Sequence, residues 1–98
     1  MTGSTDPIVQ DHAVSEMRAL VLEITKALVD EPEAVHVDVL SEGGAIILRV
    51  EVSPRDLGKV IGKQGRTARS LRTILGAASM KLKHRFSLDI VEVPEQPQ

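Results

Sequence analysis

Apolar residues recur at every third or fourth position between residues 12 and 28, and this spacing predicts an amphipathic helix. Its predicted buried stripe comprises Ala13, Val14, Met17, Leu20, Val21, Ile24, Ala27 and Leu28. The helix should end near Asp30, because Pro32 disfavours helical geometry in the residue before it. Residues 1–11 are polar and lack this periodicity, so we expect a flexible leader there and, by composition, a disordered tail at 94–98.

Strict alternation of apolar and polar residues predicts three strands. The first covers residues 35–39 with its three valines inward, and the second covers residues 46–52. The link at residues 41–44 has turn chemistry, and so short a connection implies an antiparallel hairpin. The third strand alternates from Arg85, with Phe86, Leu88 and Ile90 inward, and reaches about Val93.

Two helices are predicted between the second and third strands. Ser53 can cap the first, Pro54 suits its first position, and Asp56 stands three residues after the cap, where it can complete a capping box. This short helix carries Leu57, Val60 and Ile61. The second helix should run from about Arg66 to Met80, before a loop at residues 81–83, and its buried stripe comprises Ala68, Leu71, Ile74, Leu75 and Ala78.

The predicted order is therefore helix, strand, strand, helix, helix, strand. Because two helices precede the last strand, that strand can lie parallel to the second one. All helices would then cover one face of a three-stranded mixed sheet, which is a two-layer α+β domain. A chain of 98 residues is long enough for one such domain, which we place at residues 12–93.

Between the two predicted helices lies the stretch with the clearest candidate chemistry, Gly62-Lys63-Gln64-Gly65. Glycine allows positive φ and lets a ligand come close to the backbone. A helix that begins near Arg66 also presents free N–H groups and the positive end of its dipole. Together with Lys63 these features suit a phosphate group, although two glycines alone are equally consistent with a tight helix–turn–helix.

The net charge of −2 conceals a strong asymmetry along the chain. Residues 1–57 contain 4 Lys or Arg and 11 Asp or Glu, whereas residues 58–98 contain 8 and 3. From Arg55 to Arg85 there are nine cations and a single acid, Asp56. Such a clustered basic region is typical of a protein with an anionic partner, although a solvated face without a partner also fits.

The stretch from Val60 to Gly65, placed between two helices after a strand, resembles the GXXG signature of a KH domain. KH domains clamp about four nucleotides of single-stranded nucleic acid against this loop. The element order resembles the type II, bacterial arrangement. Chain length, the single KH unit and residues 53–66 resemble the family of small bacterial single-KH proteins called KhpA, over about residues 13–93.

The resemblance implies an RNA-binding site of eight residues, namely Lys59, Ile61, Gly62, Lys63, Gln64, Gly65, Arg66 and Arg69. The glycines would let phosphates approach the backbone, and the cations would add charge along the same track. An apolar floor for bases would come from Leu57, Val60, Ile61, Ala68 and Leu71. The opposite wall would come from residues 81–86, and because that loop is short we expect little base selectivity.

The same resemblance implies a setting and partners. It implies a protein that binds single-stranded RNA as an RNA chaperone or post-transcriptional regulator. From the residues themselves we expect a cytoplasmic, non-enzymatic protein without metal or cofactor. The resemblance also implies a homodimer, pairing with a larger multidomain KH protein of the KhpB type, and links to cell elongation, cell shape and envelope (peptidoglycan) homeostasis. No apolar run approaches the ~20 residues of a membrane span.

Other functional classes fit the sequence less well. The stretch from Gly58 to Lys63 is two residues short of a nucleotide-binding phosphate loop, and Gln64 replaces the hydroxyl that would hold Mg²⁺. The histidines lie in three separate segments without metal-ligand spacing, and there is no cysteine. RRM and cold-shock folds need aromatic platforms, and Phe86 is the only Phe, Tyr or Trp.

One competing interpretation stays open. The acidic first half also allows a KH-fold module for protein interaction or dimerisation with little intrinsic RNA affinity. In that case Val60 and Ile61 would form an interface instead of a floor for bases. Both uses can coexist, because a dimer with two weak sites gains avidity.

Overall fold

The computed structural model describes residues 11–93, so the predicted tail and all but the last residue of the predicted leader lie outside the described residues. Asp11 belongs to the folded domain. Its carboxylate accepts hydrogen bonds from the N–H groups of Ala13 (2.8 Å) and Val14 (3.4 Å) and thereby caps helix α2 (His12–Leu28). The assignment of residue 11 to the leader was therefore wrong. Within residues 11–93 no helix combines the length and apolar character needed to cross a membrane.

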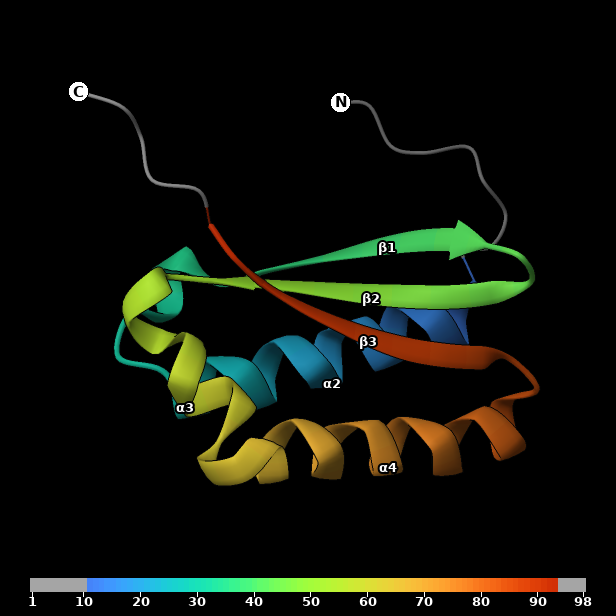
Figure 1. The fold of residues 1–98 in the computed structure, drawn as a ribbon. Helices are drawn as coiled ribbons and strands as arrows, with labels where there is room; N and C mark the ends of the chain where they lie inside the picture. The colour runs from blue at the N-terminus through green and yellow to red at the C-terminus, as the bar shows by residue number, and fades with distance from the viewer. Residues whose placement is uncertain (1–10, 94–98) are drawn as a thin grey trace, which may run out of the picture.

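The remaining elements follow in the predicted order. They are β1 (His36–Glu42), β2 (Ala45–Val52), α3 (Leu57–Ile61), α4 (Arg66–Leu82) and β3 (Arg85–Glu92). Strand β2 is central, pairing antiparallel with β1 and parallel with β3. Helices α2, α3 and α4 all lie on one face of this sheet (Figure 1). The predicted two-layer α+β fold with a mixed sheet is confirmed.

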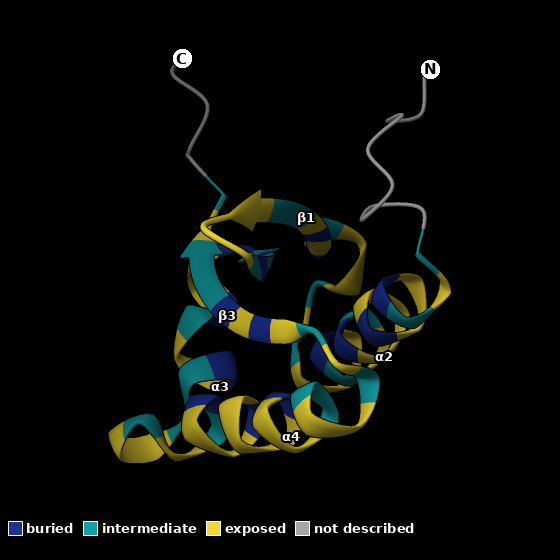
Figure 2. Ribbon diagram, turned by 90° about the vertical axis from the view of Figure 1, so that its right-hand side faces the viewer, coloured by how far each residue is buried: buried dark blue, intermediate teal, exposed yellow. Residues whose placement is uncertain are grey.

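The core between sheet and helices is almost entirely aliphatic. Along the strands it is built by the inward members of each alternating pattern, Val37, Ile46, Leu48, Val50, Val52, Phe86 and Leu88. The helices contribute Val14, Met17, Val21, Val60, Leu71 and Leu75. Figure 2 shows these buried segments turned toward the space between the two layers. The period of two in the sequence therefore predicted the inward face of the strands correctly.

Several predicted boundaries were wrong by a few residues. Strand β1 begins at His36 and continues through Glu42, so the hairpin turn is only Gly43 and Gly44, with φ values of +57° and +81°. Two consecutive positive φ values are those of a type I′ turn, whose twist matches that of a hairpin. Helix α4 continues to Leu82, so residues 81 and 82 belong to the helix and not to a loop.

The predicted buried stripes of the two long helices were partly wrong. Leu20 and Leu28 on α2 and Ile74 on α4 are 44%, 36% and 48% exposed, whereas Thr25, outside the predicted stripe, is buried. The Thr25 hydroxyl donates to the Val21 carbonyl at 2.8 Å, which satisfies its polar group inside the core. The face that α2 packs on the sheet is therefore turned toward Thr25 and away from Leu20.

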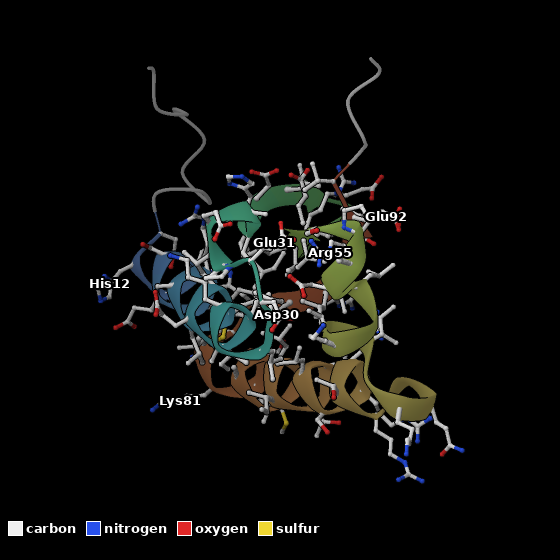
Figure 3. The ribbon with its side chains drawn as sticks, turned by 90° about the vertical axis from the view of Figure 1, so that its left-hand side faces the viewer. His12, Asp30, Glu31, Arg55, Lys81 and Glu92 are labelled. Carbon is white, nitrogen blue, oxygen red and sulfur yellow. The ribbon has the colours of Figure 1, made fainter. Side chains whose placement is uncertain are left out.

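Asp56 does not complete a capping box. Ser53 caps the turn before α3 as predicted, accepting the Arg55 N–H at 3.4 Å. The Asp56 side chain, only 1% exposed, instead accepts the N–H groups of Asp30 (3.2 Å) and Glu31 (3.0 Å). It therefore ties the start of α3 to the connector after α2, and Figure 3 shows Asp30, Glu31 and Arg55 together at this junction.

Candidate nucleic-acid interface

The turn between α3 and α4, residues 62–65, contains three residues with positive φ and is called the glycine turn below. Gly62 (φ +81°, ψ 169°) ends α3, and Gln64 (φ +57°) and Gly65 (φ +73°) are left-handed. The Gly65 N–H donates to the Gly62 carbonyl at 3.0 Å and closes the turn. Lys63 and Gln64 are consequently exposed at its tip.

The two glycines serve different purposes. A Cβ atom on Gly62 would collide with the Thr67 side chain and would lie 2.8 Å from the Thr67 backbone nitrogen. A Cβ atom on Gly65 would meet nothing within 4 Å. Gly62 is therefore required by the packing of the turn itself, whereas the space beside Gly65 is open to a ligand.

The glycine turn leads directly into the N-terminus of α4. Gly65 occupies the N-cap position, so no side chain caps the helix, and its first turn contains no acidic residue. The first N–H groups of a helix have no partner inside the helix, and the dipole of this 17-residue helix is positive at that end. This end of α4 is therefore suited to an anion.

Three of the predicted cations lie together here. Lys63, Arg66 and Arg69 are exposed, and none of them belongs to an ion pair within residues 11–93. Helix α4 itself contains no Asp or Glu. Their positive charge is therefore not compensated by a neighbouring carboxylate, and it adds to the field of the helix terminus.

Lys59 does not join this group. Its Nζ lies 3.3 Å from an Asp30 oxygen and 3.4 Å from an Asp56 oxygen. Hydrogen bonding to Asp30, and then to Asp56, raises the pKa of Lys59 above its ordinary value. The structure therefore places Lys59 in the junction between α3 and the connector after α2, and not among the free cations of the predicted RNA track.

Most of the predicted apolar floor lies in the core. Val60, Ala68 and Leu71 are 0%, 4% and 6% exposed, so they are inaccessible to a base or to a partner protein. Leu57 at the start of α3 and Ile61 at its end, next to the glycine turn, are half-buried and therefore partly accessible. An interface built on Val60, as the interaction-module alternative supposed, is therefore ruled out by burial.

A cavity of about 230 Å³ lies between α4 and the edge strand β3, lined by Arg72, Leu75, Phe86, Ser87 and Leu88. A guanidinium nitrogen of Arg72 donates to the Leu88 carbonyl at 3.5 Å across this cavity. Arg72 was absent from the predicted site. Its position three residues after Arg69 was a usable signal, because residues three apart on a helix are neighbours.

The histidines make no common site. His12 lies 3.4 Å from Glu16, His84 lies 3.2 Å from Asp11, and His36 is exposed on β1. In the described part of the chain, no group of three or more His, Asp and Glu side chains is placed to hold a metal ion.

Comparison with known proteins agrees with this geometry. The sequence profile of the family described as KhpA/KhpB, KH domain, matches residues 18–90. An RNA-binding protein KhpA from Caldanaerobacter subterraneus is 48% identical over 75 residues, which cover 76% of this chain and 100% of that protein. An RNA-binding protein KhpA from Halalkalibacterium halodurans is 47% identical over 76 residues, covering 78% and 100% of the two chains.

A likeness also exists among solved structures. Era from Aquifex aeolicus superposes with a TM-score of 0.53 at 16% identity, over 82% of this chain and 31% of Era. At this low identity the likeness concerns the fold alone. The profile match and the two KhpA relatives carry the assignment: the chain belongs to the KhpA/KhpB family of KH domains.

Proposed function

We propose that the protein is a non-enzymatic, cytoplasmic protein that binds single-stranded RNA through its glycine turn. The observation that carries this proposal is the turn itself. It adjoins an uncapped helix N-terminus and three exposed cations that form no ion pair within residues 11–93, and the space beside Gly65 is open. The relatives named RNA-binding protein KhpA support the same activity.

In this proposal the phosphates of the strand contact the N–H groups at the start of α4 and the side chains of Lys63, Arg66 and Arg69. Bases rest against the accessible parts of Leu57 and Ile61. Phosphate contacts fix position without reading sequence, so base selectivity should be low. We expect an affinity of about micromolar or weaker at physiological salt, falling steeply as salt rises.

The proposed biological role follows the family: an RNA chaperone or post-transcriptional regulator that acts as a homodimer or with a KhpB-type partner, connected with cell elongation and envelope homeostasis. Exposed Leu20, Leu28, Ile74 and Met80 support partner contact, because the described domain leaves these large apolar side chains in solvent. Size-exclusion chromatography with light scattering tests the oligomer. A monomer at every concentration would contradict the homodimer.

Replacing Lys63 and Gln64 by aspartate should lower RNA affinity at least tenfold, because the change puts two negative charges where phosphates are expected. Fluorescence anisotropy with short single-stranded RNAs measures this loss. Both side chains are exposed, and aspartate tolerates the left-handed conformation of Gln64, so circular dichroism should show an unchanged fold.

The matched control for this variant is Ser15→Asp with Lys26→Asp, two exposed positions of α2 that give the same change in net charge. We expect this control to retain RNA affinity within about threefold, because it alters only the long-range field. Equal losses in both variants would show a nonspecific charge effect. A folded glycine-turn variant with unchanged affinity would remove the basis of the proposed function.

A further inference from the structure

A second group of cations stands at the opposite end of α4 from the glycine turn. Lys81, Lys83 and Arg85 are exposed, and none belongs to an ion pair among the described residues. Figure 3 shows Lys81 at this far end of the helix. Because α4 has 17 residues, about 25 Å separate the two ends. No Asp or Glu occurs in the sequence from residue 57 to residue 88.

The short connection between α4 and β3, which carries Lys83 and precedes Arg85, is held by three contacts. The Lys83 N–H donates to the Ser79 carbonyl at 3.0 Å, with Lys83 itself left-handed at φ +61°. The Phe86 N–H donates to the Ser79 hydroxyl at 3.0 Å. The His84 ring nitrogen Nε2 lies 3.2 Å from the Asp11 carboxylate.

These contacts keep the connection in one position, so its two cations are presented without the entropy loss of ordering a flexible loop. They also engage the Asp11 carboxylate, which bonds His84 and caps α2. The charges of Lys83 and Arg85 therefore stay available to an external anion.

Arg72 stands midway along α4, beside the cavity of about 230 Å³ at the edge of β3. The other surfaces of the domain are mixed in charge. The sheet face away from the helices carries Asp38, Glu51 and Asp89 together with Arg49 and Arg85, and the exposed side of α2 carries two acids and two cations. Helix α4 has cations and no acid, so an anionic strand leaving the glycine turn is favoured along α4.

We propose that bound RNA extends from the glycine turn along α4, past Arg72, to a second phosphate contact at Lys83 and Arg85. This inference rests on the proposed function and enlarges its site. The preferred ligand is then a single strand of about eight nucleotides, roughly twice the four that a GXXG loop clamps. In this role the short connection binds the far end of the strand through its charge. It does not form a wall that encloses the bases.

The test compares random-sequence RNA oligonucleotides of four and ten nucleotides by fluorescence anisotropy. A ten-nucleotide RNA offers a four-nucleotide site roughly sevenfold more registers, so that factor is the baseline for length alone. Wild type should bind the longer RNA about fiftyfold more tightly than the shorter one. The variant that carries Lys83→Gln and Arg85→Gln should bind the shorter RNA with an affinity within twofold of that of wild type. Its preference for the longer RNA should be only the sevenfold baseline. Its salt slope on the longer RNA should fall by about 1.4, which is 0.7 for each lost phosphate contact.

The matched control is Lys26→Gln with Arg55→Gln, two exposed cations away from α4 whose removal gives the same net charge. This control should keep the fiftyfold ratio. The second contact is overturned if the Lys83 and Arg85 variant keeps the wild-type ratio and salt slope, or if the control loses them equally. A different result would contradict the proposed function. In that result the variant with Lys63→Asp and Gln64→Asp binds the four-nucleotide RNA as tightly as wild type does. Wild type that binds neither RNA at millimolar concentration overturns both proposals.

Discussion

Replacing Asp56 by alanine is expected to lower the melting temperature of the domain by roughly 10–20 °C, measured by circular dichroism. The Asp56 carboxylate is buried and accepts the N–H groups of Asp30 and Glu31 while pairing with Lys59. Alanine leaves two backbone donors and a lysine without this partner, and unpaired polar groups are costly away from water. The Asp56 carboxylate, together with the Lys59–Asp30 ion pair, holds the junction that positions α3 and with it the glycine turn.

Asp89→Ala is the matched control, because Asp89 also pairs with a cation but lies near the surface. Its carboxylate is 3.2 Å from the Arg49 guanidinium, and the side chains of Asp89 and Arg49 are 46% and 43% exposed. Solvent screens such a pair, so we expect its loss to lower the melting temperature by no more than about 4 °C. Similar shifts in the two variants would contradict the special role of Asp56.

The Asp56 junction also predicts a pH dependence. Burial raises the pKa of Asp56, but the hydrogen bonds from Asp30, Glu31 and Lys59 outweigh it and hold that pKa below its ordinary value of 3.8. The stabilisation is therefore complete above pH 3.8 and is lost as the pH falls below it, through the folded-state pKa. In melting curves between pH 7 and pH 2, the difference between wild type and Asp56→Asn should shrink toward the acid end. A difference that stays constant would contradict the assignment.

Asp56 also illustrates what the sequence could not predict. Its spacing from Ser53 fits a capping box, and that local interpretation ignores an acceptor role toward backbone groups 25 and 26 residues away. The same limit applies to Lys59. A count of basic residues places it with the other cations, whereas its actual partners include Asp30, which only the packing of α3 against the connector brings near.

Local periodicity was more informative for the strands than for the helices. Residues such as Leu48 and Val50 lie inward because side chains alternate strictly along a strand, whatever the strand packs against. A helix has a broad apolar face, and its rotation depends on the surface that it covers. That is why Leu20 was placed in the core and Thr25 was missed, although the helix itself was predicted within two residues.

The candidate site shows the same division. The positions of Gly62 and Gly65 between two helices, and the uncompensated cations after them, follow from sequence order and composition. Sequence order and composition do not show which apolar residues near the turn are accessible to a base. Val60, Ala68 and Leu71 are apolar, as a floor for bases requires, but they are buried in the core.

Gly62→Ala should disrupt the glycine turn, whereas Gly65→Ala should be tolerated at a cost of about 1–2 kcal/mol. At Gly62 a methyl group meets Thr67, and the φ/ψ of +81°/169° lies in a region that is essentially limited to glycine. At Gly65 the φ of +73° is unfavourable, but there is no steric obstacle. Urea or thermal unfolding of the two variants should therefore show a several-fold larger loss for Gly62→Ala, together with loss of binding to the four-nucleotide RNA.

Adding Thr67→Ala to Gly62→Ala separates the steric cause from the backbone cause. Thr67→Ala removes the hydroxyl that collides with the new methyl group. The Cβ atom of residue 67 would still lie 2.7 Å and its backbone nitrogen 2.8 Å from that methyl group, and φ would still be positive. We therefore expect less than half of the lost stability to return. Full recovery would show that crowding by the Thr67 hydroxyl alone fixes Gly62. A Gly65→Ala variant as damaged as Gly62→Ala would show instead that positive φ, and not the contact with Thr67, is the dominant requirement of this turn.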